Sequence, residues 1–126
     1  MGETFADLTI RGTRKSRTIH AIVDTGATNT TIEKDLAAEL GIEPIDQQEV
    51  VLANGKLDTV GIGSAEVVIN GIRRVVPLFI YDSNLIGLTT LEAAGLRVNP
   101  VSRQLEKVPG KLLGIKVEGK RLSKTL

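Results

Sequence analysis

The sequence contains no cysteine and no tryptophan, and its one histidine is His20. The absence of cysteine excludes disulfides, thiolate nucleophiles and cysteine zinc sites. A single histidine excludes a multi-histidine metal site within one chain and leaves at most one Ser–His pair. Aromatic residues make up only 2% of the chain, so stacked rings for binding single-stranded nucleic acid are not expected. The chemistry must therefore come from carboxylates and hydroxyls, without a metal or cofactor.

An excess of charge of one sign is missing as well. The 126 residues include 16 Lys and Arg against 15 Asp and Glu, which leaves a formal net charge of +1. This balance argues against a dedicated binder of nucleic acid or of anionic membranes. No apolar run approaches the roughly 20 residues that cross a bilayer, and the start, M-G-E-T-F-A-D, lacks the order of a signal peptide. We expect a cytoplasmic protein without a membrane anchor.

Most of the chain has the residue pattern of β-strands within one domain, residues 1–126. Asn54-Gly55 and Asn70-Gly71 predict two-residue hairpin turns, because both residue types tolerate positive φ. Pro77 interrupts an apolar strand and indicates an edge or a bulge there. The tail, residues 110–126, is expected to form an extra strand or to fray. The expected strands are residues 4–11, 17–23, 48–52, 57–62, 65–69 and 73–81, with a hairpin within 96–108 that turns at Asn99-Pro100.

Two short stretches have helical spacing. In the first, apolar residues recur at Ile32, Leu36, Ala37 and Leu40, and Gly41 follows them. We expect Thr30 or Thr31 to cap this helix, because threonine hydroxyls accept hydrogen bonds from free N–H groups at a helix start. The second predicted helix begins at Leu88 and has Gly95 near its end.

Asp24 stands at the end of the apolar strand and directly before Thr25-Gly26. Gly26 allows a tight turn with the backbone close to whatever Asp24 binds. Hydrolysis of an amide by carboxylates needs one ionised and one protonated group, and no other aspartate in the chain precedes Thr-Gly or Ser-Gly. If Asp24 is catalytic, its partner must come from a second copy of the chain.

Three features in this order resemble the retroviral-type (retropepsin-like) aspartic proteases, and most of all their cellular and prokaryotic members. The first is I-V-D-T-G-A-T at 22–28, and the second is a hairpin about 30 residues later with its tip at Asn54-Gly55. The third is Leu85-Ile86-Gly87 with the helix L-T-T-L-E-A-A-G-L after it. The resemblance covers residues 4–108.

The resemblance implies an all-β fold, a closed barrel with one or two short helices that corresponds to half of a pepsin-like molecule. It also implies an aspartic endopeptidase that acts as a homodimer on peptides or unfolded proteins. Asp24 of each copy would activate the attacking water, Thr25 would bond across the two-fold axis, and the hairpin would close over the substrate. The implied catalytic residues are Asp24, Thr25 and Gly26, and the implied substrate-binding residues are Ala27, Thr28, Asn54, Gly55, Leu85 and Ile86.

The sequence departs from the viral enzymes at two positions near the implied site. Those enzymes have an Asp after D-T-G-A and an Arg after the apolar-apolar-Gly element, and the two side chains pair near the dimer interface. Thr28 and Leu88 stand there in this chain. Because both charges are absent together, no unpaired buried charge remains, and we expect more apolar dimer contacts. The hairpin tip, A-N-G-K, also lacks the family's Gly-rich sequence.

Four alternatives remain open. Asp24 is also compatible with an Asx turn that bonds its own backbone, and His20 with a residue of the core or surface. The chain is compatible with a dimeric module of the same fold that binds extended peptides without cutting them. By family analogy alone, it also resembles an interaction domain of a proteolytic or ubiquitin-like pathway.

Overall fold

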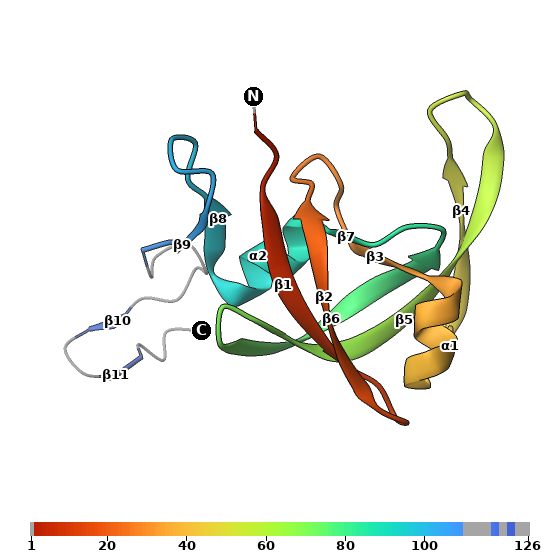
Figure 1. The fold of residues 1–126 in the computed structure, drawn as a ribbon, viewed down its shortest axis with the longest axis horizontal. Coiled ribbons are helices and arrows are strands. Elements are labelled where there is room, and N and C mark those ends of the chain that lie inside the picture. Colours follow the sequence, from red (N-terminus) through yellow and green to blue (C-terminus); the bar gives the residue numbers. More distant parts are fainter. Residues whose placement is uncertain (1, 110–116, 119–120, 123–126) are drawn as a thin grey trace.

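The computed structural model describes residues 2–109, 117–118 and 121–122, and strands dominate it (Figure 1). Among these residues, neither helix has the length and apolar character that a membrane crossing needs. The helices are α1 (Lys34–Leu40) and α2 (Leu88–Ala94). The strands are β1 (Phe5–Arg11), β2 (Ser16–Val23), β3 (Thr30–Glu33), β4 (Asp46–Val51), β5 (Leu57–Ile69), β6 (Ile72–Tyr81), β7 (Leu85–Ile86), β8 (Leu96–Val98), β9 (Leu105–Lys107), β10 (Val117–Glu118) and β11 (Arg121–Leu122).

Six strands form a ring of hydrogen-bonded neighbours, in the order β1, β2, β7, β3, β6 and β5, and β5 pairs with β1 again. The short strand β7 runs parallel to β2 and antiparallel to β3, so it lies between the strand before Asp24 and the strand after it. Of the predicted all-β fold with one or two short helices, the structure confirms a mostly β chain with two short helices. The structure shows this ring of strands, and the closed barrel stays a prediction.

The core inside the ring is aliphatic, as the shortage of aromatic residues requires. Its largest fully buried side chains come from β1, β3, β5, β6, β7 and both helices. Alternate residues of each strand point into it, which is the pattern of strands with one buried face. These side chains include Leu8, Ile10, Ile32, Leu40, Val67, Ile69, Leu78, Ile86 and Leu91.

β4 and the first part of β5 leave the ring together and project from it as a hairpin (Figure 1). We call residues 48–60, which lie beyond the last pairing of β5 with β6 at Gly61, the outer hairpin. Its tip is a three-residue loop, because the Leu52 N–H donates to the Lys56 carbonyl at 2.8 Å. Only Gly55 has positive φ there, at 83°, so the predicted two-residue turn is wrong. At the second hairpin the prediction is confirmed, because Asn70 and Gly71 have φ of 49° and 76°.

The predicted start of the first helix is wrong. Residues Thr30–Glu33 form β3, which pairs in parallel with β6, and the helix begins only at Lys34. Glu33 occupies the N-cap position without a side-chain cap, so neither threonine caps the helix. Ile32 is buried in a strand as it would be in a helix, and backbone pairing with β6 favours the strand for these β-branched residues. Gly41 ends the helix as predicted.

The remaining sequence predictions mostly agree with the structure. Residues 57–69 form one continuous strand instead of two. The second helix ends at Gly95, and the hairpin within 96–108 is present as β8 and β9. Pro77 is exposed and precedes the part of β6 that pairs with β3, which fits the predicted edge. The predicted tail strand, L-L-G-I-K-V, lies outside the described residues except for Val117.

A buried pair of hydroxyls joins β3 to α2. The Oγ1 atoms of Thr30 and Thr90 lie 2.6 Å apart, and each residue is 1% exposed. The Gly87 N–H also donates to Thr30 Oγ1, at 3.0 Å. Thr30 therefore satisfies two buried polar groups on the segment that carries β7 and α2.

We expect Thr30→Val to lower the free energy of unfolding by about 2–4 kcal/mol, because the Gly87 N–H and the Thr90 hydroxyl both lose a buried partner. Urea unfolding measures the change. The matched control is Thr18→Val, which also removes one member of a threonine pair, the Thr9–Thr18 contact of 2.7 Å, at an exposed position. It should change stability by no more than about 0.5 kcal/mol. Equal losses in the two variants would contradict this account.

Candidate active site

Asp24 directly follows β2, and its backbone is held by the strand beside it. The Asp24 N–H donates to the Ile86 carbonyl of β7 at 2.9 Å. One residue earlier, the Val23 N–H donates to the Thr4 carbonyl at 2.7 Å. Although its backbone is fixed on both sides, the Asp24 side chain is exposed. The fold therefore presents this carboxylate at a defined position on the surface of one chain.

The residues after Asp24 turn back on themselves. The Gly26 N–H donates to Asp24 Oδ1 at 3.0 Å, and the Ala27 N–H donates to the Asp24 carbonyl at 3.1 Å. The first of these bonds is the Asx turn of the alternative interpretation, so the structure contains it. The bond orients the carboxylate through one oxygen, and it leaves Oδ2 without a hydrogen bond inside the described part of the chain.

The start of α2 supports the same loop from the other side. The Leu88 N–H donates to the Ala27 carbonyl, and the Thr89 N–H donates to the Thr28 carbonyl, each at 2.8 Å. The D-T-G-A-T loop is therefore joined through backbone hydrogen bonds to Ile86 of the L-I-G segment and to the start of α2. These bonds also use N–H groups that a helix start would otherwise leave free.

Gly87 makes this contact possible because it has no side chain. A Cβ atom on Gly87 would lie 2.3 Å from the carbonyl carbon of Asn29 and 2.8 Å from the nitrogen of Thr30. Both are backbone atoms, so they cannot rotate away. The glycine of L-I-G is thus a steric requirement for passing β7 beside the loop that carries Asp24.

A match to known proteins agrees with this geometry. Residues 6–117 match a family model described as aspartyl protease. The chain belongs to the aspartyl protease family. The resemblance to retropepsin-like members is thereby confirmed, and it covers most of the sequence. No curated protein shows significant similarity to the chain.

A single copy of this aspartyl protease domain brings only one carboxylate to the site. In the described residues, no ion pair involves Asp24, and its side chain bonds only to the backbone of its own turn. No group of three His, Cys, Asp or Glu side chains there could hold a metal ion. His20 lies on the surface of β2, where it contacts Asp7 at 2.9 Å and stacks on Phe5, in agreement with the surface alternative.

The predicted substrate-binding residues fall into two groups. Ala27 and Thr28 lie in the Asp24 loop, and Leu85 is half-buried on β7, where it pairs with Ile22 of β2 and Thr31 of β3. Asn54 and Gly55 are exposed at the tip of the outer hairpin. The Asp24 loop and this hairpin project from the same side of the ring (Figure 1). Ile86 is 0% exposed, so its side chain belongs to the core and only its carbonyl serves the site.

Sequence reasoning missed a polar contact beside the outer hairpin. The Tyr81 hydroxyl donates to the Asp58 carboxylate. This hydrogen bond and that from the Thr59 N–H hold the pKa of Asp58 below its usual value. In turn, the hydrogen bond to Asp58 raises the pKa of Tyr81 to about 12. The one available sequence signal was that Tyr81 is the only tyrosine and follows an apolar strand.

A groove in the described part of the chain lies away from Asp24. It has a volume of about 1110 Å³ and is formed by α1, the turn between β1 and β2, and residues 41–47. It is an open surface feature that contains none of the site residues.

We expect Gly87→Ala to destabilise the fold by about 3 kcal/mol or more, because backbone atoms must move to admit the methyl group. Gly71→Ala is the control: that glycine has φ of 76°, but nothing lies within 4 Å of the added Cβ. Only backbone strain acts there, and a loss of about 1–2 kcal/mol is expected. Urea unfolding compares the two. Similar losses of stability in the two variants would show that the close contact at Gly87 does not contribute to the stability of the fold.

Proposed function

We propose that the protein is an aspartic endopeptidase, assembled from two copies of the chain that each contribute Asp24. The observation that carries this proposal is the Asp24 carboxylate, exposed on a loop whose backbone is bonded to Ile86, Leu88 and Thr89. Rigid support of an exposed carboxylate is what a reacting group needs. An Asx turn alone would not require a second segment to hold its loop.

In the proposed dimer the two Asp24 carboxylates face each other and share one proton, because two such groups in contact do not both ionise easily. The ionised carboxylate takes a proton from a water molecule, whose oxygen bonds to the carbonyl carbon of the peptide. The carbon–nitrogen bond then breaks, and the leaving nitrogen receives a proton from the pair. One water is consumed, and an acid and an amine are produced.

The neighbouring residues have supporting roles in this proposal. Thr25 is exposed beside Asp24, and its hydroxyl bonds across the two-fold axis. An extended peptide binds by strand addition to the backbones of Gly26, Ala27 and Thr28. The Leu85 side chain contacts the same peptide. The outer hairpin covers that peptide with its tip at Asn54 and Gly55, and it excludes water from the reacting carbonyl.

Leu88 supports the proposed contact between copies. It is 37% exposed, although it is a large apolar residue, and its N–H is bonded to the Asp24 loop. Thr28, which also lacks charge, is exposed nearby. Burial of such surface by a second copy is favourable, whereas the viral enzymes use an ion pair at these positions.

We expect the wild-type protein to cleave a denatured protein substrate between about pH 3 and pH 7, and pepstatin to suppress the cleavage. Asp24→Asn should lower the rate by at least about 1000-fold, because an amide cannot exchange the required proton. Gel electrophoresis and mass spectrometry of the fragments measure the effect. Asp46→Asn, an exposed site on β4, is the control and should keep its activity.

If the dimeric wild type cuts nothing at any pH, the mechanism is wrong. A dimer that binds an extended peptide without cutting it would favour the binding-module alternative. Equal cleavage by wild type and Asp24→Asn would place the activity elsewhere.

We expect Leu88→Glu to weaken dimerisation at least about tenfold, because each copy then buries a charge without a partner. The helix itself should tolerate the change, since glutamate suits the positive end of a helix dipole. Sedimentation over a range of concentrations measures the dissociation constant. The control is Val101→Glu, at a residue that is 90% exposed in the loop between β8 and β9. Equal dissociation constants for the two variants would remove Leu88 from the interface.

A further inference from the structure

We propose that the Tyr81–Asp58 hydrogen bond is the anchor that positions the outer hairpin over the substrate site. Asp58 belongs to the hairpin, on the return strand just after its tip, whereas Tyr81 ends β6 inside the ring. The bond thus joins the projecting part of the molecule to its fixed part. The inference rests on the proposed function, in which this hairpin covers a bound peptide.

The outer hairpin has few other ties to the rest of the protein. Its own hydrogen bonds are local, within the pairing of β4 with β5 and within the tip. No ion pair of the described residues involves it, and Tyr81–Asp58 is its one side-chain hydrogen bond to another element there. Nearly all its residues are exposed, including Val51 at 70% and Leu57 at 61%. An isolated two-stranded hairpin in water is only marginally stable.

The register of the strands explains why Tyr81 reaches this aspartate. The pairing of β5 with β6 ends at Gly61 opposite Ile80. One step further places Tyr81 opposite Val60, and Asp58 lies two residues along on the same face of β5, a diagonal distance that a long aromatic side chain spans. The tyrosine therefore holds β5 beyond the point where backbone pairing with the ring stops.

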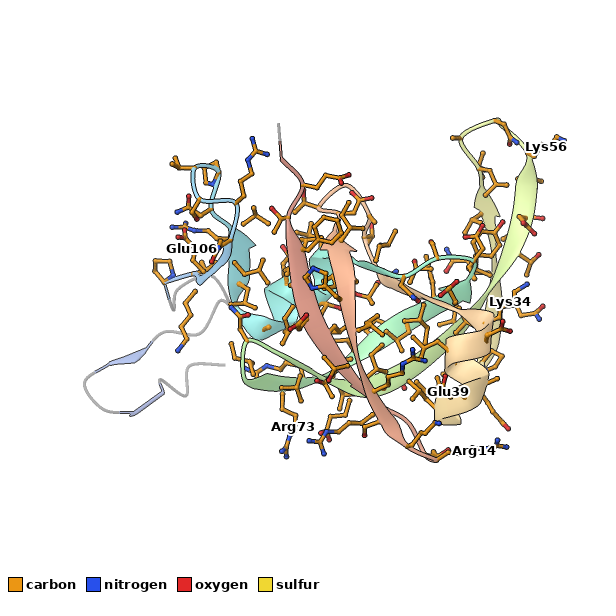
Figure 2. All side chains as sticks on the ribbon, viewed as in Figure 1. Arg14, Lys34, Glu39, Lys56, Arg73 and Glu106 are labelled. Carbon is orange, nitrogen blue, oxygen red and sulfur yellow. The ribbon has the colours of Figure 1, made fainter. Side chains whose placement is uncertain are left out.

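The tyrosine is itself held in place. Lys34 is the first residue of α1, and its Nζ atom lies 6.0 Å from the centre of the Tyr81 ring. Figure 2 shows Lys34 beside the hairpin and Lys56 at its far tip. Next to Tyr81 in sequence is the polar turn 82–84, where the Glu33 N–H donates to Asn84 Oδ1 at 2.9 Å. This turn leads directly into β7, which bonds the Asp24 backbone, so one segment fixes both the hairpin and the reacting loop.

The anchor makes Tyr81 and Asp58 positioning residues, since neither touches the reacting atoms in the proposed mechanism. A hairpin held in a fixed position over the site binds the substrate and the transition state equally well. Its loss should therefore raise KM and leave kcat almost unchanged. A residue needed only for folding would instead lower the active fraction and reduce kcat.

The experiment uses the full chain and the variants Tyr81→Phe, Asp58→Asn and the double variant. Asp46→Asn is the matched control, because Asp46 and Asp58 each accept the N–H of the next residue at 2.8 Å, and Asp46 lies before the outer hairpin, opposite Ile62 of the ring. Each variant of the pair should raise KM about three- to tenfold, and the double variant should do no more than either one. Asp46→Asn should leave KM unchanged.

Two further readouts do not depend on cleavage. Tyr81 is the only tyrosine and no tryptophan is present, so an absorbance titration follows its phenol alone. Its pKa, raised to about 12 by Asp58, should fall toward the ordinary tyrosine value in Asp58→Asn and not in Asp46→Asn. At neutral pH, Tyr81→Phe should speed hydrogen exchange of the outer hairpin amides without affecting β1 and β2.

The anchor is wrong if hairpin exchange in Tyr81→Phe equals that of the wild type, or if the wild-type phenol titrates at the ordinary value. A fall in kcat at constant KM would contradict the positioning role. If the wild type cleaves no peptide, the proposed function fails and the role over the substrate fails with it. Titration and hydrogen exchange would then still decide whether the anchor holds the hairpin.

Discussion

The close passage of the Gly87 backbone beside Asn29 and Thr30 is the contact on which the site depends. It allows β7 to enter between β2 and β3, where the Ile86 carbonyl accepts the Asp24 N–H. Without it the ring would open between these two strands, because β7 is their common neighbour. The Thr30 hydroxyl satisfies the Gly87 N–H at this point, so close packing does not leave a buried donor unpaired. The close contact at Gly87 thus completes the ring of strands and also positions the Asp24 carboxylate.

The structure divides into a well-packed ring and a hairpin that stands in solvent. In the ring, aliphatic side chains are fully buried, and the hydroxyls of the buried Thr30 and Thr90 bond to each other. In the outer hairpin almost every residue is exposed. Regions with few buried contacts open at low free energy, and elements that move on binding are drawn from them. Such a division suits a protease, which needs reacting groups at fixed positions and a cover that admits the substrate. The Tyr81–Asp58 hydrogen bond joins the outer hairpin to the ring.

Much of this arrangement was predictable because it depends on local patterns. The strands follow from alternation, the tight turn at Asn70-Gly71 from positive φ, and the Asp24 loop with its L-I-G partner from the family resemblance. The errors arise where long-range pairing decides. Thr30–Glu33 has helical spacing with the residues after it, but β6 recruits it as a strand. The Tyr81–Asp58 bond joins residues 23 positions apart across two strands, and nothing local marks either residue as a partner.

The same reasoning explains why one chain holds only half of the proposed site. The Asp24 carboxylate accepts one hydrogen bond within the described part of the chain, from the Gly26 N–H. This is sufficient because the residue is exposed to water. If a second copy covers it, the two carboxylates lose that water, and their repulsion is relieved by sharing a proton. In the proposed mechanism the shared proton is therefore a consequence of assembly. Exposed, uncharged neighbours such as Thr28 and Leu88 suit this arrangement, because a second copy can cover them without burying an unpaired charge.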